Sequence, residues 1–190
     1  NCAAFRSSGW FLKVTRMEPG YADGWVNVAR ARIQEGNMAG GEQMLRKALD
    51  VDPNLAKTHF FLGTALRALG RYDEALVHLR RASALYPRDR VVLNQLGRVL
   101  FLKRQYQEAI AEFRKVLKID AEDLQAHYNL MLCYQGLGDS AAAERERVLY
   151  MRFKADESAQ AITGDYRRLN PHDNNERQQI HEHRSVASVR

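Results

Sequence analysis

Apolar residues follow one another at intervals of three and four along most of the chain, in runs separated by short polar breaks. Within a run they occupy positions i, i+3, i+4 and i+7, the spacing of a helix with one apolar face. Gly36, Gly70 and Gly138 lie in three of the breaks. Because an apolar run stands on either side of each break, the pattern predicts pairs of antiparallel helices.

The predicted pairs recur with a fixed period. Pro19, Pro53 and Pro87 are 34 residues apart, and Ala121 stands where a fourth proline would fall. Proline cannot continue a helix, so it ends the second helix of each pair. A single pair cannot bury its apolar face, and repeats of this length therefore stack on their neighbours into a solenoid. The sequence predicts an all-α fold.

Small and large residues alternate by column when the repeats are aligned. A column in the first helix holds Ala29, Gly63, Gly97 and Met131, and a column in the second helix holds Leu45, Leu79, Phe113 and Arg147. Small residues let two helices approach closely, and large residues fill the space between neighbouring pairs.

This alternation over 34 positions, ending in proline, resembles the tetratricopeptide repeat family. Residues 22–55, 56–89 and 90–123 each carry most of the pattern, and the closest copy, at 59–87, reads HFFLGTALRALGRYDEALVHLRRASALYP. The resemblance implies a right-handed α-solenoid of antiparallel helix pairs with a concave inner wall.

The two ends of the chain depart from this repeat. The unit at 124–155 is degenerate, because Ala155 replaces the proline. Residues 1–21 match the columns of a second helix, which predicts an incomplete repeat; its missing partner helix belongs either to a longer chain, the interpretation that we favour, or to another subunit. Helical spacing over 156–169 predicts a capping helix, and 170–190 is a polar tail.

The net charge of +6 comes mainly from the middle repeats. The densest basic cluster consists of Arg67, Arg71, Arg80, Arg81, Arg88 and Arg90. It is either a surface for an acidic peptide or another polyanion, or a solvated helix face, which the interspersed Asp73, Glu74 and Asp89 favour. Aromatic residues are not interleaved with basic ones as nucleic-acid binding requires, and no apolar run is long enough for membrane insertion, so neither partner is expected.

The family resemblance also implies where a partner binds. In tetratricopeptide repeats the inward side of each first helix tends to line a groove. Here the partner-binding groove is expected to contain Arg30, Lys57, Phe60, Thr64, Arg67, Asn94, Arg98, Phe101, Gln125 and Tyr128. Aromatic anchors beside arginines suit an extended or helical segment of a protein or peptide. For Phe101, packing between repeats is an equally good interpretation.

Some members of the family clamp a C-terminal carboxylate with Lys, Asn and Arg at set columns. Val26 and Phe61 occupy two of those columns here, so this mode of recognition is not expected. The sequence also lacks a Gly-rich phosphate loop and a triad-like arrangement of Ser or Cys with His, and it predicts no enzyme. His181 and His183, with His172 nearby, are a weak metal-binding pattern in a polar tail, and we predict no metal there.

A second, thinner resemblance is to large bacterial repeat proteins, some with multihaem cytochrome modules upstream of the repeats. It rests on YADGWVNVARA (21–31), RDRVVLNQLGR (88–98) and DNNERQQIHEH (173–183). The haem attachment motif CxxCH is absent, so no haem or other cofactor is expected in this chain. This resemblance implies a bacterial protein with a further N-terminal portion.

Two functions compete. The first is a non-enzymatic scaffold that binds a segment of a partner protein in the concave groove. The alternative is structural self-assembly, in which subunits stack head to tail into an oligomer or filament through the two ends of the chain, at Phe5, Trp10, Phe11, Ile162 and Tyr166. The sequence leaves the compartment open; a soluble protein of the bacterial periplasm or the extracellular space is compatible with it.

Overall fold

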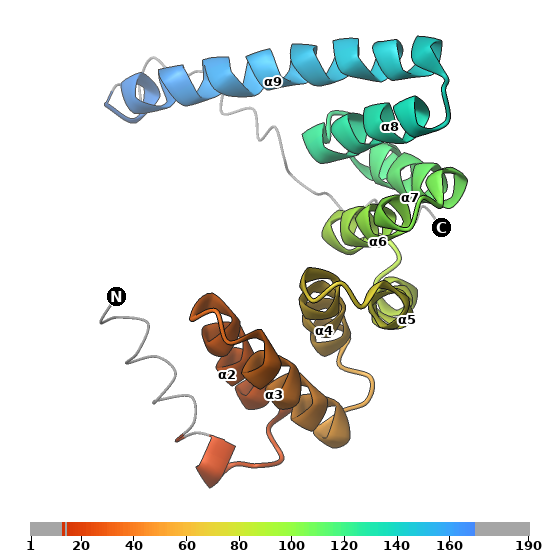
Figure 1. Cartoon of the computed structure of the whole chain (residues 1–190). Coiled ribbons are helices and arrows are strands. Elements are labelled where there is room, and N and C mark those ends of the chain that lie inside the picture. Colours follow the sequence, from red (N-terminus) through yellow and green to blue (C-terminus); the bar gives the residue numbers. More distant parts are fainter. Residues whose placement is uncertain (1–12, 14, 170–190) are drawn as a thin grey trace, which may run out of the picture. The chain divides into compact units, whose positions relative to one another are not determined.

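The described part of the chain consists of helices and the turns between them. The computed structural model describes residues 13 and 15–169, and the side chains of 13 and 15–155. The helices are α2 (Ala22–Gln34), α3 (Met38–Val51), α4 (Ala56–Ala68), α5 (Tyr72–Leu85), α6 (Arg90–Leu102), α7 (Tyr106–Ile119), α8 (Leu124–Gly136) and α9 (Ser140–Leu169) (Figure 1). The described residues contain no strand, which confirms the predicted all-α solenoid.

The chain divides into two compact units, 1–150 and 151–190. In the first, each of α2, α4 and α6 packs against the helix that follows it, and each pair packs against the next. The first helices also contact one another, α2 with α4, α4 with α6 and α6 with α8, whereas α3, α5 and α7 make no such contacts among themselves. The first helices therefore lie closer together and form the inner side of this stack.

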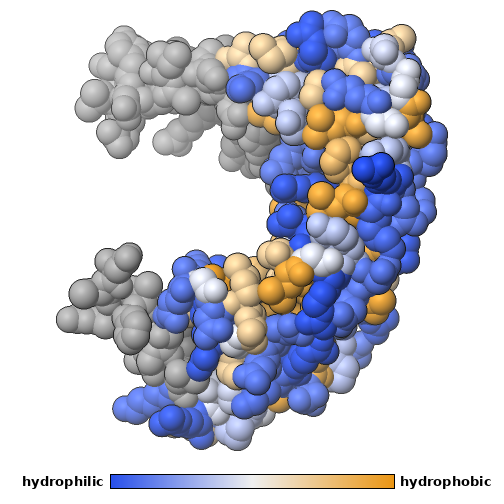
Figure 2. All heavy atoms as spheres, viewed as in Figure 1, coloured by the Kyte–Doolittle hydropathy of each residue, from blue (hydrophilic) through white to orange (hydrophobic). Residues whose placement is uncertain are grey.

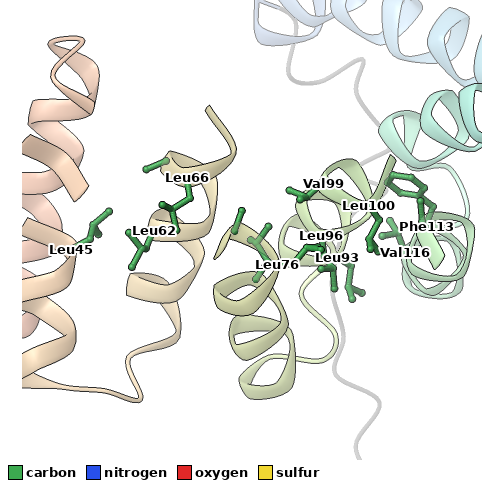
Figure 3. Close-up of a cluster of buried hydrophobic side chains, with 14 of the residues drawn as sticks. Leu45, Leu62, Leu66, Leu76, Leu93, Leu96, Val99, Leu100, Phe113 and Val116 are labelled. Carbon is green, nitrogen blue, oxygen red and sulfur yellow. The ribbon is translucent and has the colours of Figure 1, made fainter. Parts of the chain in front are cut away.

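A continuous apolar core runs through the stack (Figure 3). Leu79 and Phe113, from the predicted column of large residues, are completely buried. Each faces a glycine of the small-residue column: a Cβ atom added at Gly63 would lie 2.6 Å from Leu79, and one added at Gly97 would lie 2.6 Å from Phe113. The two columns thus fit together by size, as the sequence predicts.

The turn within each helix pair contains one residue in the left-handed backbone conformation, with a positive φ angle. Gly36, Gly70 and Gly138 have φ angles of 84°, 76° and 76°. The same position in the third repeat is Arg104, with a φ of 60°. Glycine adopts this conformation without a steric penalty, whereas a residue with a Cβ atom does not.

The turn between repeats is held by a ring N–H group. The indole nitrogen of Trp25 donates to the carbonyl oxygen six residues earlier, at 2.9 Å. The Nε2 atoms of His59 and His127 make the same 2.9 Å contact in their own repeats. Leu93 takes this position in the third repeat and has no donor to offer. A buried or partly buried carbonyl that accepts such a bond avoids the cost of lost hydration.

The last helix is longer than the repeat requires. The helix expected at 156–169 forms the second half of α9, which continues from Ser140 to Leu169. At the other end, residues 15–17 are helical and Thr15 is buried. No helix within the described ranges combines the length and the apolar character needed to cross a bilayer.

Candidate functional site

An open pocket lies between the beginning of α4 and the beginning of α6. It has a volume of about 490 Å³ and is lined by Leu55, Ala56, Lys57, Phe60, Tyr86, Asp89, Val91 and Val92. This volume falls in the range of natural binding pockets. Tyr86 and Val91 are 60% and 53% exposed. In Figure 2 apolar surface is visible over α4 and over α6.

The aromatic groove residues keep part of their surface accessible. Phe60 is half-buried and meets the edge of Phe61, with ring centroids 5.3 Å apart. The guanidinium of Arg30, an exposed residue, lies 5.1 Å from the centre of the Phe61 ring, within the range of a cation–π contact. The α4 aromatic pair and Arg30 therefore form one continuous patch across the first two repeats.

The groove aromatics of the last two repeats each have an aromatic neighbour. Phe101 is half-buried, and its ring centre is 5.7 Å from that of Tyr106 in the partner helix of its own repeat. Tyr128 is 43% exposed and its ring centre is 5.4 Å from that of Tyr150. Gln125 is exposed at the beginning of α8.

Three polar residues of the expected groove already form hydrogen bonds or an ion pair with other residues of the chain. The hydroxyl of Thr64 donates to the carbonyl oxygens of Phe60 and Phe61 in its own helix, at 2.7 and 3.0 Å. Lys57 pairs with Asp23 of the preceding repeat.

Asn94, the third of these residues, is only 4% exposed. Its amide group donates to the Asp123 carboxylate of the next repeat, at 3.2 and 3.4 Å. The side chain therefore lies in the contact between repeats and is not on the groove surface.

Arg67 in α4 and Arg98 in α6 differ from these residues. Within the described residues neither has an ion pair, and the Nε atom of Arg67 is buried without a hydrogen-bond partner. Burial, and then the neighbouring charge of Arg98, lower the pKa of the Arg67 guanidinium. Two half-buried cations on adjacent first helices thus lie close enough for the charge of one to act on the other, and neither has a carboxylate partner among the described residues.

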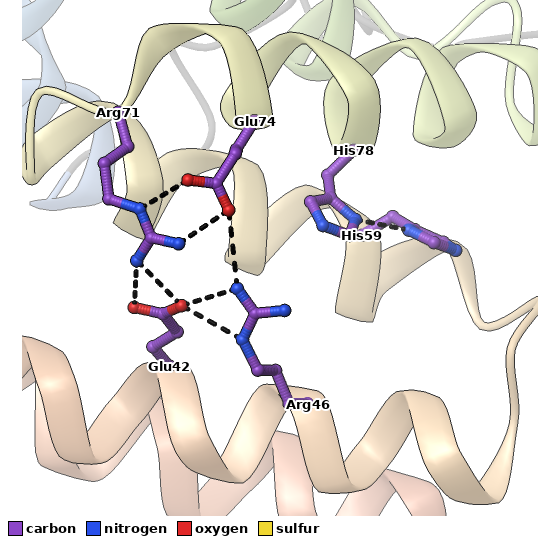
Figure 4. A network of polar contacts seen from close by, with 6 residues as sticks. All are labelled: Glu42, Arg46, His59, Arg71, Glu74 and His78. Carbon is purple, nitrogen blue, oxygen red and sulfur yellow. Dashed lines mark hydrogen bonds and ion pairs between the residues drawn. The ribbon is translucent and has the colours of Figure 1, made fainter.

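Three other arginines of the basic cluster, Arg71, Arg80 and Arg90, are paired with carboxylates. Arg71 bonds Glu42 at 2.8 Å and Glu74 at 2.6 Å, and Arg46 contacts the same two carboxylates, which closes a four-residue network between α3 and α5 (Figure 4). Burial opposes ionisation of Glu42, but the hydrogen bonds from Arg46 and Arg71 outweigh it and lower the pKa of this carboxyl group.

Other arginines of the cluster contact a carboxylate or an amide oxygen of a residue that is distant in the sequence. Arg80 contacts Glu108 at 3.4 Å, Arg81 donates to the side chain of Asn54 at 2.6 Å, and Arg90 pairs with Asp120. These contacts support the solvated-face interpretation for the outer arginines.

Two histidines of the first helices have different partners in the second helices. The Nδ1 atoms of His59 and His78 are 3.0 Å apart (Figure 4), whereas Nδ1 of His127 is 2.7 Å from the Glu146 carboxylate. Burial is the main reason that the pKa of His78 is lowered, helped by the charges of His59 and Arg46. Burial also acts on His127, but the Glu146 bond and the carbonyl bond outweigh it and raise its pKa.

Several residues that the sequence singles out lie outside what the structure describes. Phe5, Trp10, Phe11, His172, His181 and His183 belong to undescribed segments, and only the backbone is described at Ile162 and Tyr166. Within the described ranges, no group of three or more His, Cys, Asp or Glu side chains is placed to hold a metal. Cys133 is buried, which raises the pKa of its thiol to about 12 and keeps it protonated.

The sequence prediction included Lys57 and Phe60 of the pocket but missed Tyr86. A signal was present: the residue before the repeat proline, or before Ala121, is Asp52, Tyr86 and Asp120 in successive repeats. The Asp52 carboxylate accepts from the backbone of the following turn. A tyrosine in place of this turn residue leaves an exposed aromatic ring beside the pocket.

Comparison with known proteins gives three matches to models of the tetratricopeptide repeat, over residues 21–88, 60–123 and 124–146. A curated relative, the type IV pilus assembly protein PilF of Pseudomonas aeruginosa, is 27% identical over 113 residues, which are 60% of this chain and 44% of PilF. The chain thus spans less than half the length of this relative. These matches do not bear on the resemblance to haem-bearing repeat proteins.

Solved structures share the fold at low identity. MamA of Desulfovibrio magneticus RS-1 has a TM-score of 0.76 at 19% identity, with 80% of this chain and 86% of that chain covered. YrrB, described as a TPR protein with an unusual peptide-binding site, has a TM-score of 0.72 at 20% identity, with 86% and 84% covered. Repeat models that together span 21–146 and neighbours with the same solenoid lead to one conclusion: this chain belongs to the tetratricopeptide repeat family.

Proposed function

We propose that the chain is a non-enzymatic scaffold that binds a segment of a partner protein along its first helices. The observation that carries this proposal is the apolar pocket between α4 and α6, whose rim includes the exposed Tyr86 and Val91. Exposed apolar side chains around an open pocket lose water when a partner side chain enters, which favours association. YrrB, a protein of the same fold with a peptide-binding site, supports the same use of the solenoid here.

The residues that line the pocket indicate which kind of partner side chain can bind in it. Its lining is mostly aliphatic and aromatic, and the charge of Lys57 is already balanced by Asp23. A large apolar side chain of the partner is therefore the expected anchor, and polar groups of the flanking segment remain at the rim. Phe60 forms part of the pocket and, with Phe61 and Arg30, continues the surface towards the first repeat.

The test is a titration of ¹⁵N-labelled protein with Ser–Gly peptides that carry a single Phe. We expect saturable shifts of the backbone amides around Phe60 and Val91. Val91→Ser should weaken binding about tenfold, because it removes part of the apolar rim. Val77→Ser is the matched control: Val77 is 65% exposed on α5, outside the pocket, and its replacement should leave binding unchanged.

Equal binding by the two valine variants, or no saturable shift with any peptide, would remove the basis of the proposal. Self-assembly through the ends of the chain stays a prediction. Light scattering over a concentration series of the same samples tests it, since an oligomer would grow with concentration in the absence of peptide.

A further inference from the structure

We propose that Arg67 and Arg98 bind the side-chain carboxylate of an Asp or Glu in the partner segment, next to the apolar pocket. This inference rests on the proposed function, because it adds an acidic residue to the segment that the pocket anchors. The partner then has a defined chemistry: one large apolar residue and one acidic residue at a fixed separation in an extended chain.

The cations of the stack divide into paired and unpaired groups. Arg71, Arg80 and Arg90 each contact a carboxylate of another helix or of the turn that follows one, and so does Lys103. In the described part of the chain Arg67 and Arg98 have no such contact, although both are half-buried. Arg32 is also half-buried without a carboxylate contact, but only Arg67 has a buried Nε–H group without an acceptor and a second unpaired arginine close enough to affect its pKa.

The environment of Arg67 favours an external anion. Its Nε–H group is buried and has no acceptor within the described residues. A buried donor without an acceptor costs free energy, and two nearby like charges add to that cost. A carboxylate bound to the accessible N–H groups of the two guanidinium groups would balance this charge, with the short, charge-assisted bonds typical of Arg–carboxylate pairs.

The distance between the pocket and the arginines sets the spacing in the partner. Phe60 and Arg67 are seven residues apart on α4, which corresponds to a rise of roughly 10 Å. An extended peptide covers that distance in about three residues. The apolar and acidic residues of the partner should therefore be separated by two others, as in Phe-x-x-Asp or, for the opposite chain direction, Asp-x-x-Phe.

The experiment extends the peptide titration to matched pairs. The probes are C-terminally amidated Ser–Gly peptides with Phe-x-x-Asp or Asp-x-x-Phe, and the same peptides with Asn in place of Asp. We expect the better of the two Asp peptides to bind about tenfold more tightly than its Asn counterpart, with shifts of the Nε–H signals of Arg67 and Arg98. Added salt should reduce this advantage.

Protein variants assign the effect to the two arginines. Arg98→Gln should abolish the preference for Asp over Asn while the Phe-only peptide still binds. Arg67→Gln should do the same and leave the melting temperature equal or higher, because it removes an unpaired, half-buried charge. Arg145→Gln, which removes an equal charge at an exposed position of α9, should keep the preference.

The outcomes separate this inference from the proposed function. If the Phe-only peptide binds at the pocket but Asp adds nothing, the carboxylate site is wrong and the scaffold proposal stands. The same peptides are also made with a free C-terminal carboxylate. If the gain appears only with the free carboxylate and the amidated Asp peptides gain nothing, the site binds chain ends and the inference is overturned. If no peptide binds at all, both proposals fail.

Discussion

At the scale of single residues, one column of the repeat decides the geometry of each turn. Three repeats have a glycine with positive φ at this column, and the third repeat has Arg104 in the same conformation. A left-handed residue with a Cβ atom costs about 1–2 kcal/mol relative to a right-handed one. The turn of the third repeat is thus formed against a local preference, and the packing of α6 on α7 holds it in place.

Replacing Arg104 by glycine should therefore stabilise the protein. We expect the free energy of unfolding to rise by about 0.5–1 kcal/mol, since relief of the strain exceeds the extra entropy of glycine in the unfolded chain. Urea unfolding followed by circular dichroism measures the change. Gly70→Ala is the reciprocal control and should lower the free energy of unfolding by about 0.5–1 kcal/mol, because strain and unfolded-chain entropy act in the opposite direction. A loss of stability in Arg104→Gly would show that the arginine side chain contributes more than its backbone costs.

At the scale of helix pairs, two repeats hold their helices together through histidine in opposite ways. In the α4–α5 pair, His59 faces His78, and burial lowers the pKa of His78. In the α8–α9 pair, His127 faces Glu146, and that bond helps to raise its pKa against the effect of burial. A lowered pKa means that the folded state binds the proton less tightly than the unfolded state, and a raised pKa means the reverse.

These opposite pKa shifts predict that the free energy of unfolding falls both at lower and at higher pH. The contribution of His78 to the free energy of unfolding is lost as the pH falls below the ordinary histidine pKa of about 6.5, because the unfolded chain then takes up the proton first. The contribution of His127 is complete below that pH and is lost as the pH rises through its raised folded pKa. The free energy of unfolding should therefore decline on both sides of about pH 6.5.

Urea unfolding between about pH 5.5 and 8 tests this dependence in the intact protein and in two variants. His78→Gln should flatten the acid side only, and His127→Gln should flatten the alkaline side only. Should either variant leave its own side unchanged, the titration of that histidine is not coupled to folding as the geometry predicts.

At the scale of the whole molecule, stability is shared between neighbours. In the first compact unit each helix from α2 to α8 contacts only helices one or two positions away in the chain. The buried core continues from repeat to repeat in the same way (Figure 3). In such a solenoid, the free energy of unfolding is approximately the sum of the intrinsic stability of each repeat and the free energies of the interfaces between neighbouring repeats. A defect in one repeat therefore mainly destabilises that repeat and its neighbours.

Phe113→Ala should show this locality. The side chain is completely buried, and its removal should cost about 3–5 kcal/mol. Amide hydrogen exchange should increase most in α6, α7 and α8 and least in α2 and α3. Val77→Ala at an exposed site should leave the exchange pattern unchanged. An equal increase over all repeats would instead show that this unit unfolds as a single cooperative body.

The repeat, the helical fold and the position of most turns can be predicted from the amino-acid sequence alone. These follow from local rules: apolar spacing along a helix, proline and glycine at turns, and the match of Gly97 with the large Phe113. Each of these signals recurs at the period of the chain, so it can be recognised without knowledge of distant contacts. Arg104, the exception in its column, is also visible in the sequence.

Which polar side chains are available to a partner can be read only from the folded arrangement of the repeats. Arg71 and Glu42 are 29 residues apart in the chain, and neither residue alone indicates that they pair. Likewise, the sequence does not show that Asn94 donates a hydrogen bond to Asp123. Nor does it show that the Nε–H group of Arg67 has no internal acceptor among the described residues. The reason is physical: ion pairs and accessible surface depend on how side chains of neighbouring repeats meet, whereas the repeat pattern depends on each helix and its immediate turn.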